Sequence, residues 1–465
     1  MTPFQYIRQT QGAVAILFCL LVTPITVLLS ASIDFSNISY VQTQLAYAAD
    51  AAAIATARYN LKDSPALASK IYYANYSGNT SKKGSNLSIN VSSDQKKITV
   101  NASQTVTPLI GIINDGNINA VSVTSVTERI AVNYELAMVL DVTGSMAENG
   151  KIAGLISASN NVVTILSNGL TTIPNGLVSI VPFVACVNVG STNTKWVDTN
   201  PTTVFPVSAP WQGCVMARTN NLNDGENPPS AGLWPLYYTS STYQQYGTQK
   251  GDNDWTLSNK GVVVVQNAIS GMAIGPNRSC GPSLVPLTNN ATTLRAKINS
   301  LAPIGGGGTI GSEGIAWGWY TISPLWRGSW NVTAGYPMNY NLETNQKMMI
   351  IVTDGTNQWY DTPNYAPVGD PTAYGRVWQN LLGTTDLDQT RDIIDNKVLN
   401  LCQQIKNKGI TIYTILLMVD DARAQQVYQQ CASEPAYAFL ANTVTTLYDQ
   451  LSVIASATQK VRIIK

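Results

Sequence analysis

The sequence predicts an α/β protein whose main domain is a doubly wound, mainly parallel sheet with helices on both faces. From residue 134 onward, apolar runs such as 136–140, 348–352 and 411–419 alternate with segments of helical character. Such runs, bounded by turn-forming residues, are typical of strands buried on both faces of a parallel sheet. Two stretches rich in Asn, Pro, Gly, Trp and Tyr, at about 190–290 and 356–392, are too long for ordinary connections, so we expect surface insertions there.

An apolar segment near the N-terminus predicts a transmembrane helix. Residues 12–33 carry no charged side chain and would form a helix of about 33 Å, enough to cross a hydrocarbon core of about 30 Å. Arg8 precedes the segment and Asp34 follows it, which places the N-terminus in the cytoplasm and the bulk of the chain outside it. A cleavable signal peptide is the alternative, but the apolar run exceeds the usual length of about 7–15 residues.

The N-terminal region resembles the TadE/TadG-like proteins of tight-adherence (Flp) pilus assembly systems. Over residues 8–60, an apolar segment beginning GAVA at Gly12 leads to Asp34, to a helix with apolar residues every three or four positions, and to ADAAA at 49–53. The resemblance implies a single-pass protein of the bacterial inner membrane. Processed subunits of such systems usually carry Glu shortly after the cleavage glycine. No Glu follows Gly12 at that distance, so we do not expect a cleaved pilus subunit.

Residues 61–132 predict a small α+β module between the N-terminal part, 1–60, and the main domain, 133–465. A short helical stretch is followed by alternating apolar and polar residues in LSINVSSDQKKITVNASQTV. This alternation predicts strands, and Asp94 and Gln95 between the two runs predict a hairpin turn.

The composition argues against several classes of function. The 28 basic and 27 acidic residues leave a net charge of +1 without a basic cluster, so we expect no nucleic-acid partner. Charged residues make up only 12% of the chain, which favours an extracytoplasmic protein over a cytosolic enzyme. The absence of histidine argues against a zinc site and against hydrolase triads with a histidine base.

Oxygen-bearing side chains follow two of the predicted strands. Asp141 and Asp354 each come at the end of an apolar run, and the carboxyl ends of parallel strands share one edge of a sheet. A run of four glycines frees the backbone to bring Thr309 to the same edge. Together with Thr143 and Ser145, they form a hard-oxygen donor set that suits Mg²⁺ or Mn²⁺. The alternative is that these side chains only cap helices.

The same five residues resemble the metal-ion-dependent adhesion site of von Willebrand factor A domains. Asp141, Thr143 and Ser145 match its Asp-x-Ser/Thr-x-Ser motif, and Thr309 and Asp354 match its two remaining positions. The resemblance spans about residues 133–460 and implies a von Willebrand factor A-like fold. It also implies a bound metal with one coordination position open to an acidic side chain of a protein partner.

The six cysteines are scattered, without a Cys-x-x-Cys spacing. We expect two disulfides, Cys402 with Cys431 and Cys214 with Cys280, because the first would join a helix to the region after the next strand and the second would restrain a long loop. The alternative is that all six are small buried hydrophobic residues.

These observations predict a membrane-anchored, metal-dependent adhesion component of an Flp pilus assembly system, and not an enzyme. Its partner would be another pilus component or a surface ligand that presents an acidic side chain. One alternative is a structural scaffold for pilus assembly with a non-functional metal site. Another is a phosphoaspartyl phosphotransferase with Asp141 as nucleophile, but the lysine of the Asp-Lys-Thr-Gly-Thr motif is missing and a pump needs several membrane helices.

Overall fold

The chain forms two compact units in the computed structural model. Unit 1 comprises Met1–Ala131 and Gln459–Lys465, and unit 2 comprises Val132–Thr458, so unit 2 is inserted between two segments of unit 1. The residues that the structure describes are 3–58, 64–76, 85–92, 97–107, 119–128, 133–199, 205–207, 209–219, 222–239, 275–359, 370–458 and 462–464.

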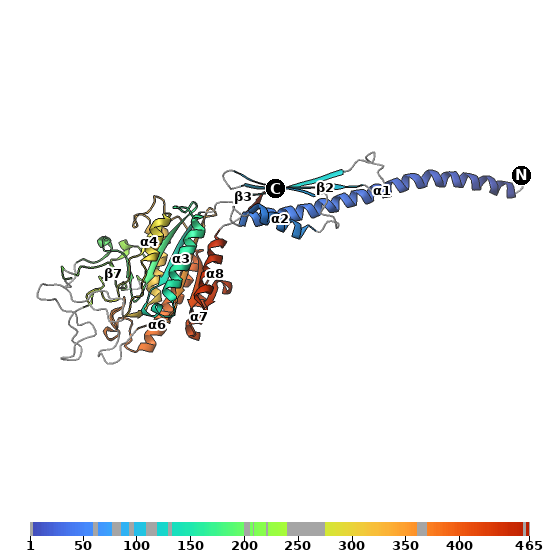
Figure 1. Ribbon diagram of the computed structural model, residues 1–465. Helices are drawn as coiled ribbons and strands as arrows, with labels where there is room; N and C mark the ends of the chain where they lie inside the picture. The colour runs from blue at the N-terminus through green and yellow to red at the C-terminus, as the bar shows by residue number, and fades with distance from the viewer. Residues whose placement is uncertain are drawn as a thin grey trace. The chain divides into compact units, whose positions relative to one another are not determined.

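Unit 1 is an antiparallel sheet with two helices against one face (Figure 1). Its elements are α1 (Pro3–Arg58), α2 (Ser64–Asn75), β1 (Ser85–Val91), β2 (Lys97–Val106), β3 (Asn119–Glu128) and β14 (Arg462–Ile464), with strand order β1-β2-β3-β14. The sequence prediction assigned the C-terminal residues to the main domain. In the structure these residues belong to unit 1, because β14 pairs antiparallel with β3.

The core of unit 1 follows from the alternation of β2. Ile98, Val100 and Ala102 are buried, whereas the polar residues between them are partly exposed, as expected for a strand with one covered face. The covering residues come from α1, where Leu45 and Ala48 are fully buried, and from α2. The helical extension and the α+β module therefore share one core. The pairing of β1 with β2 agrees with the predicted hairpin, whose turn lies outside the described residues.

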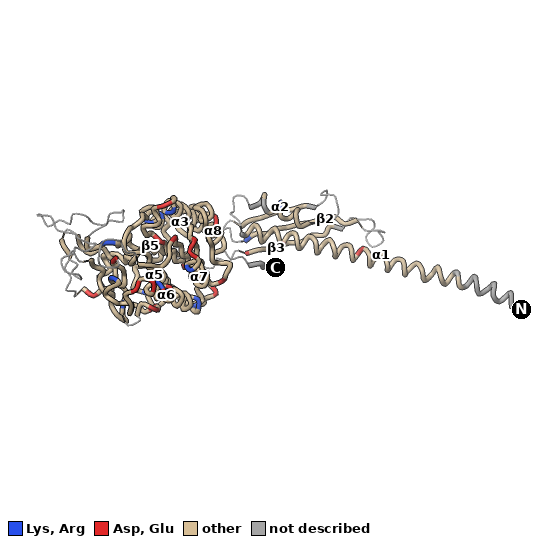
Figure 2. Tube along the Cα trace, turned by 90° about the horizontal axis from the view of Figure 1, so that it is seen from below, with Lys and Arg blue, Asp and Glu red and all other residues tan. Residues whose placement is uncertain are grey.

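Residues 16–29 of α1 are mostly apolar and exposed. Within the described residues, one helical stretch, Ile16–Ala57, is long and apolar enough to cross a membrane, with a mean hydropathy of 2.4 in its most apolar window. Side chains such as Phe18 and Leu28 are 66% and 67% exposed. Figure 2 shows few charged residues along this helix. Length and composition thus fit a membrane span.

Unit 2 contains the doubly wound sheet that the sequence predicts. Its strands are β4 (Asn133–Asp141), β5 (Gly176–Phe183), β8 (Val285–Thr288), β10 (Asn345–Thr353), β12 (Thr411–Leu417) and β13 (Ala438–Ala441). The order is β13-β12-β10-β4-β5-β8, and all neighbours are parallel except β5 and β8. The predicted α/β class with a mainly parallel sheet is confirmed.

Helices cover both faces of this sheet (Figure 2). One layer contains α3 (Lys151–Ser167), α4 (Ala291–Asn299) and α8 (Val444–Ala457), and the other contains α5 (Gly311–Ile322), α6 (Leu387–Asn407) and α7 (Ala422–Cys431). Successive residues of β4 enter opposite cores: Met138 packs with the first layer and Val139 with the second. Because helices cover both faces of the sheet, β4 is buried on both faces, as its continuous apolar run predicts.

The described parts of the predicted insertions are not confined to the surface, so that expectation was wrong for them. Trp234 and Tyr374 are buried among core residues of unit 2, and β8 and the start of α6 lie within the predicted insertion ranges. Short elements here and near the site are β6 (Val187–Asn188), β7 (Cys214–Val215), β9 (Gly308–Thr309), β11 (Gln358–Trp359) and the 3₁₀ helices Gly144–Ala147, Thr194–Trp196, Pro229–Ala231, Pro324–Trp326, Val377–Gln379 and Pro435–Tyr437.

Candidate metal site

The parallel pairing of β4 with β10 places two carboxylates at one edge of the sheet. Leu140 is opposite Val352, so the strands end together, Asp141 as the last residue of β4 and Asp354 directly after β10. Thr353 Oγ1 donates a hydrogen bond to Asp141 Oδ2 over 2.6 Å. Strand β4 has β5 on one side and β10 on the other, so this edge is a topological switch point, where ligands bind in open α/β sheets.

The loop after β4 brings the two hydroxyls to these carboxylates. The backbone N–H of Thr143 donates to Asp141 Oδ1 over 2.8 Å, which turns the chain back over the strand end. Thr143 Oγ1 and Ser145 Oγ lie 3.0 Å apart, and Ser145 Oγ donates to Asp354 Oδ1 over 2.8 Å. Ser145 is therefore in direct contact with the second carboxylate, and Thr143 contacts Ser145.

The glycine-rich loop delivers Thr309 to the same place. Ile304 N–H donates to the carbonyl of Val142 over 2.8 Å, which joins this loop to the one after β4. Gly306, Gly307 and Gly308 have φ values of 86°, 77° and 95°, a left-handed conformation that residues with a Cβ rarely adopt. The loop ends at Thr309, whose Oγ1 would lie 3.0 Å from a Cβ built on Gly355. Asp141, Thr143, Ser145 and Asp354 thus lie in one group of hydrogen-bonded side chains. Thr309 lies beside Gly355, the residue that follows Asp354.

The surroundings of Asp141 disfavour its ionised form. Asp141 is fully buried, and this desolvation, followed by the negative charge of Asp354, raises the pKa of Asp141 to about 7. Hydrogen bonds from Thr353 and Thr143 act in the opposite direction with smaller effect. A bound divalent cation would relieve the repulsion between the two carboxylates, so the residues present fit such an ion.

The donor set is also chemically selective. Among the described residues, no group of three or more His, Cys, Asp or Glu side chains could hold a metal, so the hydroxyls of Thr143, Ser145 and Thr309 have to complete any site at the two carboxylates. Hydroxyl and carboxylate oxygens favour hard cations such as Mg²⁺ or Mn²⁺ over softer ones.

Sequence reasoning missed a lysine at this site. Lys151 Nζ donates to Asp354 Oδ2 over 2.7 Å, and the Lys151 residue is only 7% exposed. It is the first residue of α3, just after the motif loop. The available signal was its position ten residues after Asp141, in a chain with few charged side chains.

Both predicted insertions contact the glycine loop. From the first insertion, Ser279 Oγ donates to the carbonyl oxygen of Gly305 over 3.5 Å. Asp370, from the second insertion, accepts a hydrogen bond from Gly307 N–H over 3.0 Å. Arg278, from the first, lies with its Nη2 3.2 and 3.1 Å from the two Asp370 carboxylate oxygens, and both residues are buried. We define Arg278 and Asp370 as the insertion clamp. Sequence patterns gave no signal for it, because the two residues lie 92 positions apart in irregular segments.

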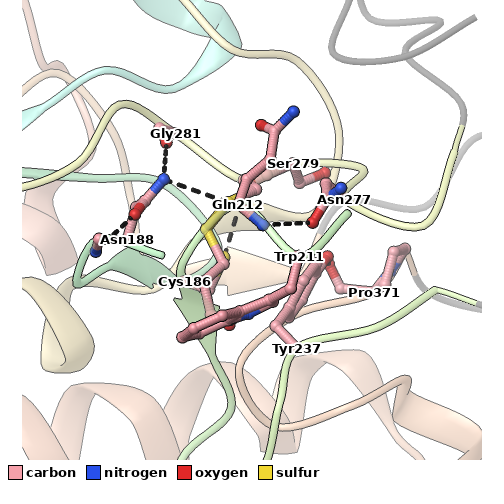
Figure 3. The surroundings of a disulfide bond; sticks show 12 residues. Cys186, Asn188, Trp211, Gln212, Tyr237, Asn277, Ser279, Gly281 and Pro371 are labelled. Carbon is pink, nitrogen blue, oxygen red and sulfur yellow. Dashed lines mark hydrogen bonds between the residues drawn. A yellow bond between two sulfur atoms is a disulfide. The ribbon is translucent and has the colours of Figure 1, made fainter. Parts of the chain in front are cut away.

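The two disulfides predicted from the sequence are formed, Cys214 with Cys280 and Cys402 with Cys431. The second joins α6 to the last residue of α7. Close to the first lies Cys186, a buried free cysteine whose thiol contacts the carbonyl oxygen of Ser279 at 3.5 Å (Figure 3). Burial raises the pKa of the Cys186 thiol, so it is suited to packing and not to nucleophilic chemistry.

Loss of the Cys214–Cys280 disulfide is expected to destabilise unit 2 strongly. The bond spans a sequence separation of 66, so replacing both cysteines by Ala should lower the free energy of unfolding by about 4 kcal/mol. The reason is that the unfolded chain without the crosslink has more conformational entropy. Urea unfolding followed by tryptophan fluorescence measures the loss. Cys186→Ala is the matched control, because it removes a buried sulfur atom without a crosslink. An equal loss in the control would contradict the prediction.

A buried carboxyl four residues after Thr309 makes stability dependent on pH. Glu313, in the first turn of α5, is fully buried and accepts a hydrogen bond from Asn223 Nδ2 over 2.6 Å. Desolvation raises the pKa of Glu313 to about 7 from an ordinary value of 4.5. The folded state therefore binds a proton that the unfolded state has released between these pH values.

We expect the contribution of Glu313 to the free energy of unfolding to fall by about 3 kcal/mol as pH rises from about 4.5 to above 7. The stabilisation by the protonated carboxyl is complete below the pKa of the unfolded state. It is lost as pH rises through the pKa of the folded state. Glu313→Gln should remove this part of the pH dependence. Unfolding curves at pH 5 and pH 8 for both proteins measure it, and an unchanged difference in the variant would contradict it.

Comparison with known families supports the N-terminal assignment. Residues 12–58 match the profile of a family described as putative Flp pilus-assembly TadE/G-like, which confirms the resemblance seen over residues 8–60. No curated protein sequence matches the chain.

Solved structures to which the chain is similar include two pilus proteins and a protein of the mussel byssus. The von Willebrand factor domain of the type V pili tip protein Mfa5 from Porphyromonas gingivalis aligns with a TM-score of 0.36 and 14% identity, over 70% of this chain and 95% of that one. The pilus adhesin SpaC from Lactobacillus rhamnosus GG aligns with a TM-score of 0.38 and 12% identity, over 82% of this chain and 35% of that one. Proximal thread matrix protein 1 from the mussel byssus, with a zinc-occupied MIDAS motif, aligns with a TM-score of 0.33 and 12% identity, over 73% of this chain and 50% of that one.

Proposed function

We propose that this chain is a membrane-anchored component of a bacterial Flp pilus system that binds a partner protein through a divalent cation. The observation that carries the proposal is the convergence of two buried carboxylates and three hydroxyls at the switch point of unit 2. The match of residues 12–58 supports the pilus context. The apolar half of α1 supports the anchor, with the N-terminus in the cytoplasm of a bacterial inner-membrane protein and the bulk of the chain outside.

The carboxylates and the hydroxyls would have different roles at the site. Asp141 and Asp354 would supply the negative charge that attracts the cation, and the hydroxyls of Thr143, Ser145 and Thr309 would orient the carboxylates and complete the coordination. When bound, Mg²⁺ or Mn²⁺ would supply a positive centre for an acidic oxygen of the partner. No catalytic group is needed for this role, so we propose binding and not catalysis.

The test is attachment of cells that carry the full chain to a surface, with Mg²⁺ present or removed by a chelator. We expect attachment to fall with the chelator and with Asp354→Ala, and to be retained by the control Asp224→Asn, whose carboxylate pairs with Lys397 at 2.6 Å and is not part of the site. The alternative of a scaffold with a non-functional metal site predicts attachment and pilus assembly that are independent of metal and of Asp354.

A further inference from the structure

The position of Lys151 is unfavourable for the helix that contains it. Lys151 is the first residue of α3, which has no acidic residue in its first turn, and the N-terminus of a helix carries partial positive charge. Two residues with positive φ, Asn149 at 52° and Gly150 at 70°, reverse the chain immediately before it. Neither helix electrostatics nor solvation of its ammonium group accounts for a lysine here.

The contact with Asp354 accounts for it. The Lys151 and Asp354 side chains are 8% and 0% exposed, and Nζ lies 2.7 Å from Asp354 Oδ2. Ser145 Oγ donates to the other oxygen, Oδ1. Both carboxylate oxygens of Asp354 are therefore occupied by donors from the chain itself, so a metal that takes an oxygen of Asp354 has to displace a donor or share that oxygen with it.

We propose that Lys151 is a tethered cation that competes with the divalent metal for Asp354. This inference rests on the proposed function. With Lys151, the net charge of the two ionised carboxylates and the ammonium group is −1, and without it the net charge is −2. Because attraction of a divalent ion grows with the negative charge of its site, Lys151 lowers the affinity for the metal. In return, it keeps Asp354 paired when no metal is bound, since an unpaired buried carboxylate is strongly destabilising.

The experiment compares Lys151→Met with the unchanged full chain in detergent. Mn²⁺ is titrated and the free ion is followed by its paramagnetic resonance signal. We expect Lys151→Met to bind Mn²⁺ at least about tenfold more tightly, since one unit of charge at short range in a buried site has an effect of this order or larger. The matched control is Lys397→Met, which breaks the Lys397–Asp224 ion pair outside the site and should leave the affinity unchanged.

Thermal unfolding with a chelator is the second readout. Lys151→Met should lower the melting temperature more than Lys397→Met, and Mn²⁺ should restore it. If Lys151→Met does not fold, Lys151→Gln removes the charge while retaining a donor to Asp354, and the same tighter binding is expected.

The outcomes separate this inference from the proposed function. If the unchanged chain binds Mn²⁺ and the Lys151 variant binds it with equal or lower affinity, the role of Lys151 is overturned but the proposed function is not. Binding only by the variant supports that role and overturns metal-dependent function in the natural chain. Absence of binding by both overturns both.

Discussion

Replacement of Asp141 or Asp354 by Ala is expected to reduce the affinity for Mn²⁺ by at least about 100-fold. Loss of a supporting residue around a metal site costs about 10–100-fold in affinity, and these side chains would contact the ion directly or through water. Both are buried, and each accepts a hydrogen bond from a hydroxyl, Asp141 from Thr353 and Asp354 from Ser145, so neither can be replaced by a neighbouring surface carboxylate. Calorimetric titration of the full chain in detergent, with Asp224→Asn as control, measures the loss.

Thermal unfolding with and without metal separates lost binding from lost folding. At a metal concentration of about 100 times the dissociation constant, binding stabilises the folded protein by about 2.7 kcal/mol. The unchanged protein should therefore melt at a higher temperature with Mg²⁺ or Mn²⁺ than with a chelator, whereas Asp141→Ala should melt at one temperature in both. Saturable binding in both Asp variants, with unchanged affinity, would contradict the assignment of the site.

The part of this site that the sequence predicts is the part encoded by local pattern. A buried apolar run that stops at Asp141, and another that stops before Asp354, indicate strand ends, and parallel strand ends share an edge. Consecutive glycines before Thr309 likewise indicate a backbone with unusual φ values, and the structure has them.

The residues that sequence reasoning missed depend on tertiary contacts. Lys151 is an ordinary helix residue by composition, and only the reversal at Asn149 and Gly150 turns it toward the carboxylates. The insertion clamp joins irregular segments that have no periodicity. For the same reason, the contact of β14 with β3 could not be predicted, because a strand of three residues has too little alternation to identify its partner.

Asp370→Asn is expected to lower the free energy of unfolding by about 3–5 kcal/mol, the usual cost of removing one partner from a buried ion pair. Asp370 is 1% exposed and pairs with Arg278, which is 3% exposed. The control is Asp392→Asn. Its carboxylate also contacts an arginine, Arg423, at 2.6 Å, but the Asp392 side chain is 59% exposed, so its loss should cost less than about 1 kcal/mol.

The same substitution should also weaken metal binding, by about 10–100-fold, although Asp370 is not proposed as a ligand. Asp370 accepts the backbone N–H of Gly307, two residues before Thr309, and so restrains the loop that carries the Thr309 hydroxyl. Arg278→Met should lower stability similarly, and the double variant should lose less than the sum, because the two residues act as one pair. Titration of Mn²⁺ with these variants measures the effect. Full affinity in a folded Asp370→Asn protein would show that the insertion clamp stabilises unit 2 without positioning the metal site.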